Sequence, residues 1–154
     1  MLKFAQPGRI TAGCTALVAA VALLAGGCAP PPELSTHNAY ITRPVPGATL
    51  SVGYAEVRNN SDRRICSSGF ESPVAGAIEL HETSTSDGRS RMRRINELCL
   101  APGERARLEP GGKHLMLFRL TLPDDLGTTT VDWVEADGTR HSGRFEVIGF
   151  DALR

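Results

Sequence analysis

The sequence predicts an all-β fold, a β-sandwich in a single domain. Short segments of β-branched or alternating apolar residues recur along the chain, with Gly, Pro, Asn and Asp between them. No stretch shows sustained helical periodicity, and no internal repeat appears. About 127 residues follow the export signal described below, which is enough for one hydrophobic core and leaves no room for a second domain.

The first five expected strands cover the N-terminal half of the domain. A β-branched and aromatic run and then a long alternating run open the series, and the second ends at Asn59, where Asn, Ser and Asp favour a turn. Ile65 and then the pair Ile78 and Leu80 mark the next two strands. Asp87-Gly88 is a strong hairpin signal before the fifth. These strands are expected at residues 39–42, 50–59, 64–68, 77–83 and 91–95.

The five remaining strands follow with shorter spacing. Pro102-Gly103 and Pro110-Gly111-Gly112 supply turns between apolar runs, and Asp137-Gly138 is the second strong hairpin signal. Between these turns, apolar residues alternate with polar ones around Leu115 and Trp133. These strands are expected at residues 97–100, 105–108, 114–120, 129–135 and 140–147.

The N-terminus has the organisation of an export signal. Lys3 and Arg9 form a basic region, residues 15–25 an apolar core, and small residues precede Cys28. The apolar run is too short to span a bilayer as a mature helix. The segment resembles a bacterial lipoprotein signal, with Cys28 as the lipidated new N-terminus. Because Leu24 stands four places before this cysteine instead of three, ordinary signal-peptidase cleavage is the alternative.

These features divide the chain into four parts. Residues 1–27 are expected to be a lipoprotein signal peptide and residues 28–38 a lipidated cysteine with a Pro-rich linker. The three prolines of this linker favour an extended spacer that holds a domain away from a membrane surface. Residues 39–149 are the β-sandwich domain, and residues 150–154 are a short tail.

The charge of the exported part argues against nucleic-acid binding. Loss of Lys3 and Arg9 with the signal leaves 15 basic side chains against 17 acidic ones. A net charge near −2 offers no electrostatic footprint for a polyanion.

Two cysteines, Cys66 and Cys99, remain in the domain once Cys14 is removed and Cys28 is lipidated. An even pair in an oxidising compartment favours a disulfide, with two free thiols as the alternative. A redox-active dithiol is disfavoured because the cysteines are thirty-three positions apart and no C-x-x-C motif occurs.

Four side chains form the candidate metal-binding motif: His81, Met92, His114 and Met116. Their spacing is H-x10-M-x21-H-x-M. Imidazole and thioether donors suit the soft copper(I) ion, whereas magnesium and calcium prefer oxygen ligands. Zinc is the weaker interpretation, because methionine is absent from its usual ligand sets. The other two histidines, His37 and His141, lie outside the motif and are expected to be solvated.

Strand alternation places these ligands away from the core. His114 and Met116 share one face of their strand, while the leucines beside them take the other. His81 likewise falls on the polar face of its strand. Met92 lies within residues 89–94, which are too basic for a core strand. Glu82, although adjacent to His81, points to the opposite face and is not expected to orient its imidazole.

The motif, with Pro73-Val74-Ala75-Gly76, Glu79-Leu80-His81-Glu82 and Pro110-Gly111-Gly112 around it, resembles the periplasmic copper chaperones of the PCuAC family. The resemblance extends from about residue 39 to residue 147. It implies a cupredoxin-like Greek-key sandwich that binds one copper(I) per chain. It also implies delivery of copper to a respiratory cytochrome c oxidase subunit or to the assembly factors of that oxidase.

Three functions are compatible with the sequence. The favoured one is an exported, membrane-anchored copper(I) metallochaperone facing the periplasm or cell exterior. A copper-sequestering or copper-resistance lipoprotein would use the same site without delivery, and a non-metal adhesion or structural lipoprotein would leave the motif incidental. An enzyme is disfavoured, because no nucleophile motif, H-E-x-x-H or phosphate loop occurs.

Replacement of Cys28 by serine tests the anchor. The Cys28→Ser variant lacks the thiol that carries the lipid, so the exported protein is expected to move from the membrane fraction to the soluble fraction. Fractionation and mass spectrometry of the mature N-terminus measure this change. A Cys14→Ser control should stay in the membrane fraction; equal fractionation of the Cys28→Ser variant and the parent would contradict the prediction.

Overall fold

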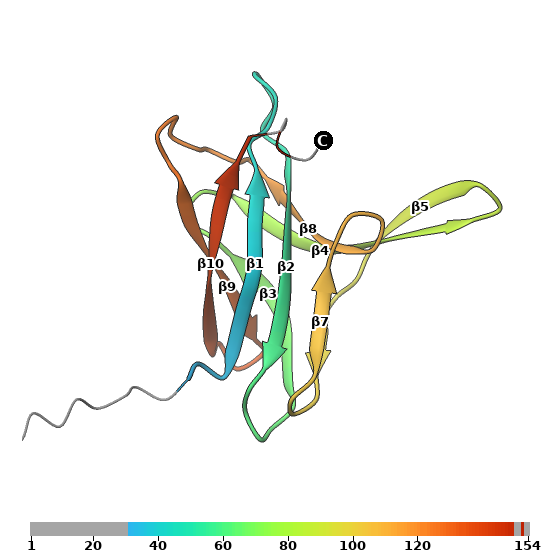
Figure 1. Ribbon diagram of the computed structural model, residues 1–154, viewed down its shortest axis with the longest axis vertical. Coiled ribbons are helices and arrows are strands. Elements are labelled where there is room, and N and C mark those ends of the chain that lie inside the picture. Colours follow the sequence, from blue (N-terminus) through green and yellow to red (C-terminus); the bar gives the residue numbers. More distant parts are fainter. Residues whose placement is uncertain (1–30, 150–151, 153–154) are drawn as a thin grey trace, which may run out of the picture.

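The computed structural model describes residues 31–149 and residue 152 (Figure 1). The predicted signal peptide and Cys28 lie outside this part of the chain. The ten strands are β1 (Leu34–Thr42), β2 (Ser51–Asn59), β3 (Ile65–Glu71), β4 (Ala77–Ser86), β5 (Arg89–Arg94), β6 (Leu98–Leu100), β7 (Arg105–Leu108), β8 (Lys113–Phe118), β9 (Thr128–Glu135) and β10 (Arg140–Ile148).

The strands form one continuous hydrogen-bonded sheet in the order β5-β4-β8-β7-β2-β1-β10-β9-β3-β6, with a further pairing of β8 to β2. Neighbours are antiparallel except for β1 with β10 and a single residue pair of β7 with β8. The all-β prediction is confirmed, and each of the ten expected strands has its counterpart. Within residues 31–149 no α-helix occurs, so no helix there is suited to crossing a membrane.

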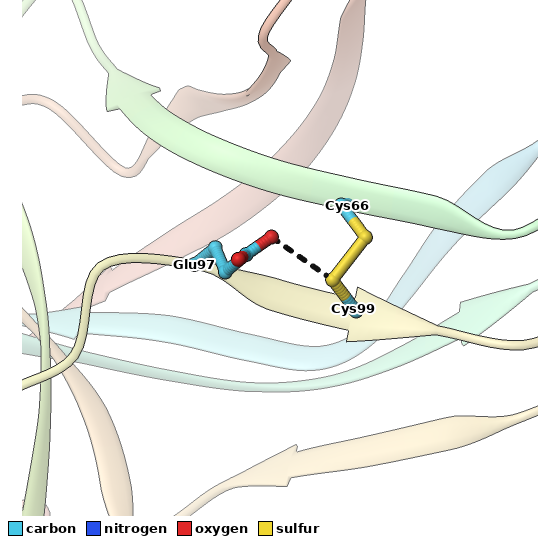
Figure 2. Close-up of side chains that lie close together, drawn as sticks. All are labelled: Cys66, Glu97 and Cys99. Atoms are coloured by element: carbon cyan, nitrogen blue, oxygen red, sulfur yellow. Dashed lines mark hydrogen bonds between the residues drawn. A yellow bond between two sulfur atoms is a disulfide. The ribbon is translucent and has the colours of Figure 1, made fainter.

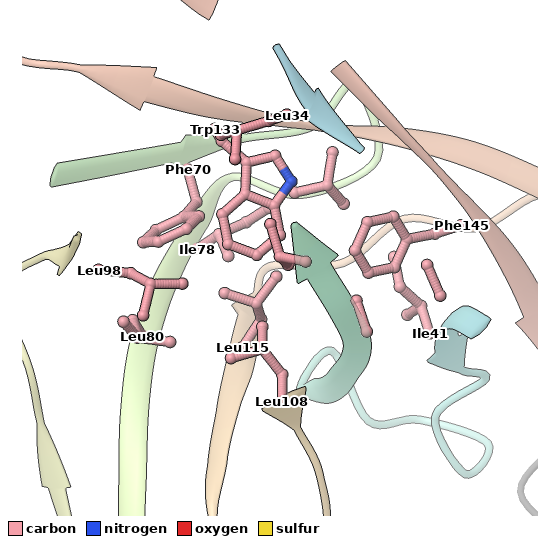
Figure 3. Packing of buried hydrophobic residues seen from close by; sticks show 14 of the residues in the cluster. Leu34, Ile41, Phe70, Ile78, Leu80, Leu98, Leu108, Leu115, Trp133 and Phe145 are labelled. Carbon is pink, nitrogen blue, oxygen red and sulfur yellow. The ribbon is translucent and has the colours of Figure 1, made fainter. Parts of the chain in front are cut away.

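The sheet curves around a single hydrophobic core. Trp133 of β9 is only 1% exposed, and Phe70 of β3 meets its ring edge-on at a centroid distance of 5.1 Å. Leu80 and Leu115, from β4 and β8, belong to the same buried cluster (Figure 3). The core therefore contacts the inner faces of β4 and β8, whose outer faces carry the candidate ligands.

Strand β1 begins earlier than the sequence indicates, at Leu34 instead of residue 39. The linker expected at residues 28–38 therefore overlaps this strand, and the β-sheet domain begins at Leu34 instead of residue 39. Leu34 is buried and pairs with Asn59 of β2. The register shifts between His37 and Tyr40, where Asn38 has a positive φ of 48°, so a bulge interrupts the alternation by which a strand is recognised.

His141 is not solvated, contrary to expectation. Its side chain is buried, and Nε2 lies 2.8 Å from Glu135 Oε1. Arg63 donates hydrogen bonds to the same carboxylate and to Glu33, just before β1. This network joins the start of the domain to β9 and β10, a long-range arrangement that the local sequence around His141 does not reveal.

Cys66 and Cys99 form a disulfide between directly paired residues of β3 and β6, with the Cα atoms 4.0 Å apart (Figure 2). Glu97 Oε2 lies 3.1 Å from Cys99 Sγ. Because a bonded sulfur carries no proton, this is a close contact. The bridge attaches the three-residue edge strand β6 to the sheet, where Leu98 and Leu100 are buried.

The hairpin predicted at Asp87-Gly88 is present. Both residues have positive φ, 51° and 72°, and Ser86 pairs with Arg89, which gives the two-residue turn that suits the twist of a hairpin. The end of the β4–β5 hairpin projects away from the body of the molecule (Figure 1).

Glu135 gives the domain a measurable acid sensitivity. Its hydrogen bond from Arg63, with a smaller contribution from His141, lowers its pKa from 4.5 to about 2. This stabilisation is complete above pH 4.5 and is lost as the pH falls toward 2. The Glu135→Gln variant should lose about 2 kcal/mol of unfolding free energy at pH 7 and show a flatter stability profile across that range. Denaturant unfolding at several pH values measures both.

The control for this prediction is Glu146→Gln, which alters an exposed carboxylate with no ion-pair partner in the described part of the chain. It should leave the stability profile of the parent unchanged. Parallel profiles for Glu135→Gln and the parent between pH 4.5 and 2 would show that this ion pair does not contribute.

Candidate metal centre

The four predicted ligands lie on one face of three neighbouring strands, β5, β4 and β8. His81 pairs directly with His114 across β4 and β8. Met92 of β5 pairs with Thr83, and Met116 of β8 pairs with Glu79, each two residues from His81 along β4. Since residues two apart share a face, all four side chains project to the same side.

The opposite face of β4 and β8 packs into the core, which fixes this orientation. Leu80 is 1% exposed, and Leu115 and Leu117 are fully buried. Slipping either strand by one residue would turn its leucines to the surface and its histidine into the core. The predicted alternation of both strands is therefore confirmed, and the hydrophobic core holds the two histidines opposite each other.

The two imidazoles are close together and partly shielded. Their ring centroids are 6.1 Å apart. His114 is only 4% exposed although it lies on the outer face. The ring centroid of Tyr54 on β2 is 6.4 Å from the ring centroid of His114. Burial raises the pKa of the Tyr54 hydroxyl, with a further contribution from Tyr40, so this ring is a neutral cover beside the histidine.

A loop carbonyl orients His114. The Nδ1 atom of His114 lies 3.1 Å from the carbonyl oxygen of Gly112, which also accepts the backbone N–H of Thr83. Gly111 has a φ of 78°, which favours glycine and directs the chain so that this carbonyl reaches both strands. Because a carbonyl only accepts, Nδ1 carries the proton and Nε2 has a free lone pair.

A carboxylate orients His81. The Nε2 atom of His81 lies 2.9 Å from Glu79 Oε2, two residues away on the same face. This hydrogen bond lowers the pKa of Glu79, with a smaller contribution from Arg94, so the carboxylate accepts and Nε2–H donates. Nδ1 of His81 then has the lone pair; it is buried and has no hydrogen-bond partner among the described residues. A buried acceptor without a partner is costly unless a ligand uses it.

Glu82 does not contact His81, as expected from alternation. It pairs directly with Arg93 on one side and Lys113 on the other, and both ion pairs lower the pKa of its carboxyl group. These contacts cross from β5 through β4 to β8 on the face opposite the ligands. Glu82 therefore helps to hold the three strands in register.

The methionines differ in exposure. Met92 is 54% exposed and is the most exposed large hydrophobic side chain in the described part of the chain, whereas Met116 is half-buried. An exposed thioether on a charged strand gains little from packing and leaves its sulfur accessible to a metal ion. The candidate centre is thus covered on the His114 side and open on the Met92 side.

The donor set suits a soft metal ion. Each imidazole has one nitrogen fixed as a hydrogen-bond donor and the other free as an acceptor, the state in which histidine binds metals. With two thioethers on the same face, this makes an N2S2 set, which favours copper(I). His37, outside the motif, is exposed on β1 and belongs to another part of the sheet.

The sequence did not indicate the roles of three groups beside the histidines: the Glu79 carboxylate, the Gly112 carbonyl and the Tyr54 ring. Glu79 could have been found by applying to it the same-face rule that excluded Glu82, since it lies two residues before His81. The role of Gly112 and the cover by Tyr54 depend on loop conformation and on the pairing of β2 with β8, which local sequence patterns do not specify.

Among the residues that the structure describes, two further clusters contain possible ligand types. Glu33, Glu135 and His141 lie together, but Arg63 already pairs with both carboxylates. The other is Cys66, Cys99 and Glu97, whose sulfurs are bonded to each other. Neither cluster offers an unused set of donors.

Comparison with known proteins identifies the family. Residues 34–131 match the family described as "LpqE-like: Putative lipoprotein LpqE-like". The chain belongs to the LpqE-like lipoprotein family. A relative from Leifsonia xyli subsp. xyli, "Putative lipoprotein Lxx21020", is 30% identical to this LpqE-like chain over 82 residues, which are 53% of this chain and 49% of the relative. The match thus spans about half the length of that relative.

Solved structures share the fold and confirm the resemblance to PCuAC domains. The copper-bound PCuAC domain from PmoF2 is 19% identical, with a TM-score of 0.60 over 76% of the LpqE-like chain and 93% of the domain. The solution structure of CuI-DR1885 from Deinococcus radiodurans is 25% identical, with a TM-score of 0.57 over 80% of this chain and 83% of that one. These neighbours establish the cupredoxin-like architecture.

The hydrogen bonds predict opposite tautomers for the two histidines in the metal-free protein. His114 should carry its proton on Nδ1 and His81 on Nε2. Long-range ¹H–¹⁵N spectra above the titration range of histidine measure both assignments. In the Glu79→Gln variant only the His81 signals should change, because Gly112 still accepts from His114. The same tautomer at both positions in the parent protein would contradict the geometry.

Proposed function

We propose that this protein is an extracytoplasmic copper(I) metallochaperone. His81, Met92, His114 and Met116 hold one copper ion per chain as cargo. The observation that carries the proposal is the placement of these four side chains on one face of β4, β5 and β8, with a free nitrogen on each imidazole. The proposal assigns no catalytic step to these residues.

The donor atoms of the proposed site determine which metal ion it can carry. Copper(I) accepts nitrogen and sulfur ligands, and a thioether has no proton to lose in the biological pH range. Glu79 and the Gly112 carbonyl hold the imidazole rings in place, so little conformational freedom is lost when the metal binds. The copper-bound state of two similarly folded proteins, the PmoF2 domain and DR1885, supports this assignment.

The uneven exposure of the ligands favours a carrier over a closed structural site. His114 is buried and Met92 is 54% exposed, so an incoming ligand would reach the metal from the β5 side. Structural metal sites are usually enclosed by their full set of protein ligands. An open side allows a partner to replace protein ligands one at a time, as transfer requires.

The recipient that the family resemblance favours is a copper centre of respiratory cytochrome c oxidase, reached directly or through assembly factors. A lipid on Cys28 would keep the chaperone at the membrane where such a partner lies. A copper-sequestering lipoprotein would bind the same ion at the same site. Loss of oxidase activity in a deletion strain under copper limitation supports delivery, whereas sensitivity to excess copper alone supports sequestration.

Anaerobic copper(I) titration of the protein from Glu33 onward, against a chromogenic chelator, tests the site. The parent should bind one equivalent tightly. Replacing both Met92 and Met116 by alanine removes half of the donor set and should weaken binding at least about a hundredfold, as expected when two soft ligands are lost.

The matched control is His37→Ala, which removes an exposed imidazole on another strand and should bind like the parent. Circular dichroism of the double variant checks that the fold is retained. Equal copper(I) affinity of the parent and the double variant would overturn the assignment of these ligands.

A further inference from the structure

Apart from Met92, the exposed residues of the β4–β5 arm have no role in the proposed copper site. Every residue from Ser84 to Arg94 is exposed, and the ribbon projects from the body of the molecule (Figure 1). A two-stranded ribbon has little stability of its own in water. A solvent-exposed extension of this kind contributes no burial to the core and leaves its outer edge accessible to another molecule.

The outer side of the arm is a free sheet edge. β5 is the first strand in the sheet order, and its only strand neighbour in the described part of the chain is β4. A free edge presents backbone N–H and C=O groups that can pair with another extended segment. The chemistry of the β5 side chains decides which segments can do so.

Those side chains are strongly basic. Arg93 pairs with Glu82, and Arg94 pairs with Glu79. Arg89 and Arg91 have no ion-pair partner among the described residues. They are two positions apart on one strand, so their side chains share a face about 7 Å apart. Two unpaired guanidinium groups at this spacing can each take a carboxylate of an extended acidic segment.

The positive charges of β5 also decide which kind of molecule can bind at its free edge. A second copy of this chain would place arginines against arginines, which disfavours self-pairing along β5. Anionic membranes are recognised by clusters of four to eight free basic side chains, whereas two of the four arginines of β5 are already paired with carboxylates. An acidic protein segment therefore fits the arm better than a lipid surface.

The arm also adjoins the accessible side of the copper site. Met92 lies between Arg91 and Arg93 on β5, on the opposite face of the strand from both arginines, and is the most exposed of the proposed ligands. A segment paired with the edge of β5 would place alternate side chains on the two faces, so residues between the carboxylates that meet Arg89 and Arg91 would project to the Met92 side. Docking and metal access would thus occur at the same end of the sheet.

We propose that the outer edge of β5 is the docking surface for an extended acidic segment of the copper-accepting protein, recognised by Arg89 and Arg91. The copper-accepting identity of the partner rests on the proposed function, whereas acidic-segment binding does not. Electrostatic attraction of this kind mainly accelerates encounter and selects the partner.

The test uses fluorescein-labelled twelve-residue peptides in which threonine alternates with Glu, Gln or Lys. Fluorescence anisotropy with the metal-free protein from Glu33 onward, at low salt, measures binding. The Glu peptide should bind at least about tenfold more tightly than the Gln peptide, the Lys peptide should not bind, and about 0.5 M salt should remove the preference.

Charge reversal at both arginines, Arg89→Glu with Arg91→Glu, should abolish the preference, whereas Arg89→Lys with Arg91→Lys should keep most of it. The matched control is Arg64→Glu with Arg144→Glu, which reverses two exposed arginines that also have no ion-pair partner among the described residues. This control should bind the Glu peptide like the parent.

Two results would overturn the proposal: an unchanged preference in the Arg89→Glu, Arg91→Glu variant, or no preference in the parent together with arginine-dependent binding to phosphatidylglycerol vesicles. The second result would assign the arm to the membrane. Because peptide binding is measured without copper, failure of docking is separate from failure of the copper titration. If the arm binds the Glu peptide and the proposed site binds copper(I), transfer of copper(I) to a Glu peptide carrying one His and two Met should be several-fold slower in the Arg89→Glu, Arg91→Glu variant.

Discussion

The two-residue alternation of β4 and β8 is the constraint on which the rest of the structure depends. Leu80 and Leu115 enter the core from the same two strands that carry His81 and His114 on their outer faces. The hydrophobic effect that fixes the register of the leucines also fixes the imidazoles opposite each other. The candidate metal centre therefore needs no dedicated scaffold, because the core positions it.

Around the two histidines, polar contacts fix the orientation of the imidazole rings. Glu79 and the Gly112 carbonyl each engage one nitrogen of a histidine and leave the other free. Tyr54 shields the His114 side, and the β4–β5 ribbon leaves Met92 accessible. The centre is covered on one side and open on the other, an asymmetry that suits capture of an ion followed by its transfer.

The proposed docking role of the exposed ribbon would connect the chemistry of the site to partner choice. Its arginines contribute little to stability because exposed ion pairs are weak, so their value lies in what they attract and repel. An arginine-rich edge also protects the sheet from pairing with copies of itself. In the proposed docking mode, partner selection and protection against self-pairing depend on the same side chains.

The sequence by itself determined the all-β class, the ten strands and the faces on which His81, His114 and Met116 lie, because alternation and turn chemistry are local properties. It indicated the donor set because residue type alone makes imidazole and thioether suitable for a soft metal. Only the tertiary structure decided that β4 lies between β5 and β8, that His141 is buried against Glu135, and that β1 begins at Leu34. These features arise from pairings between residues distant in the chain, and a bulge hides the last of them from any periodic pattern.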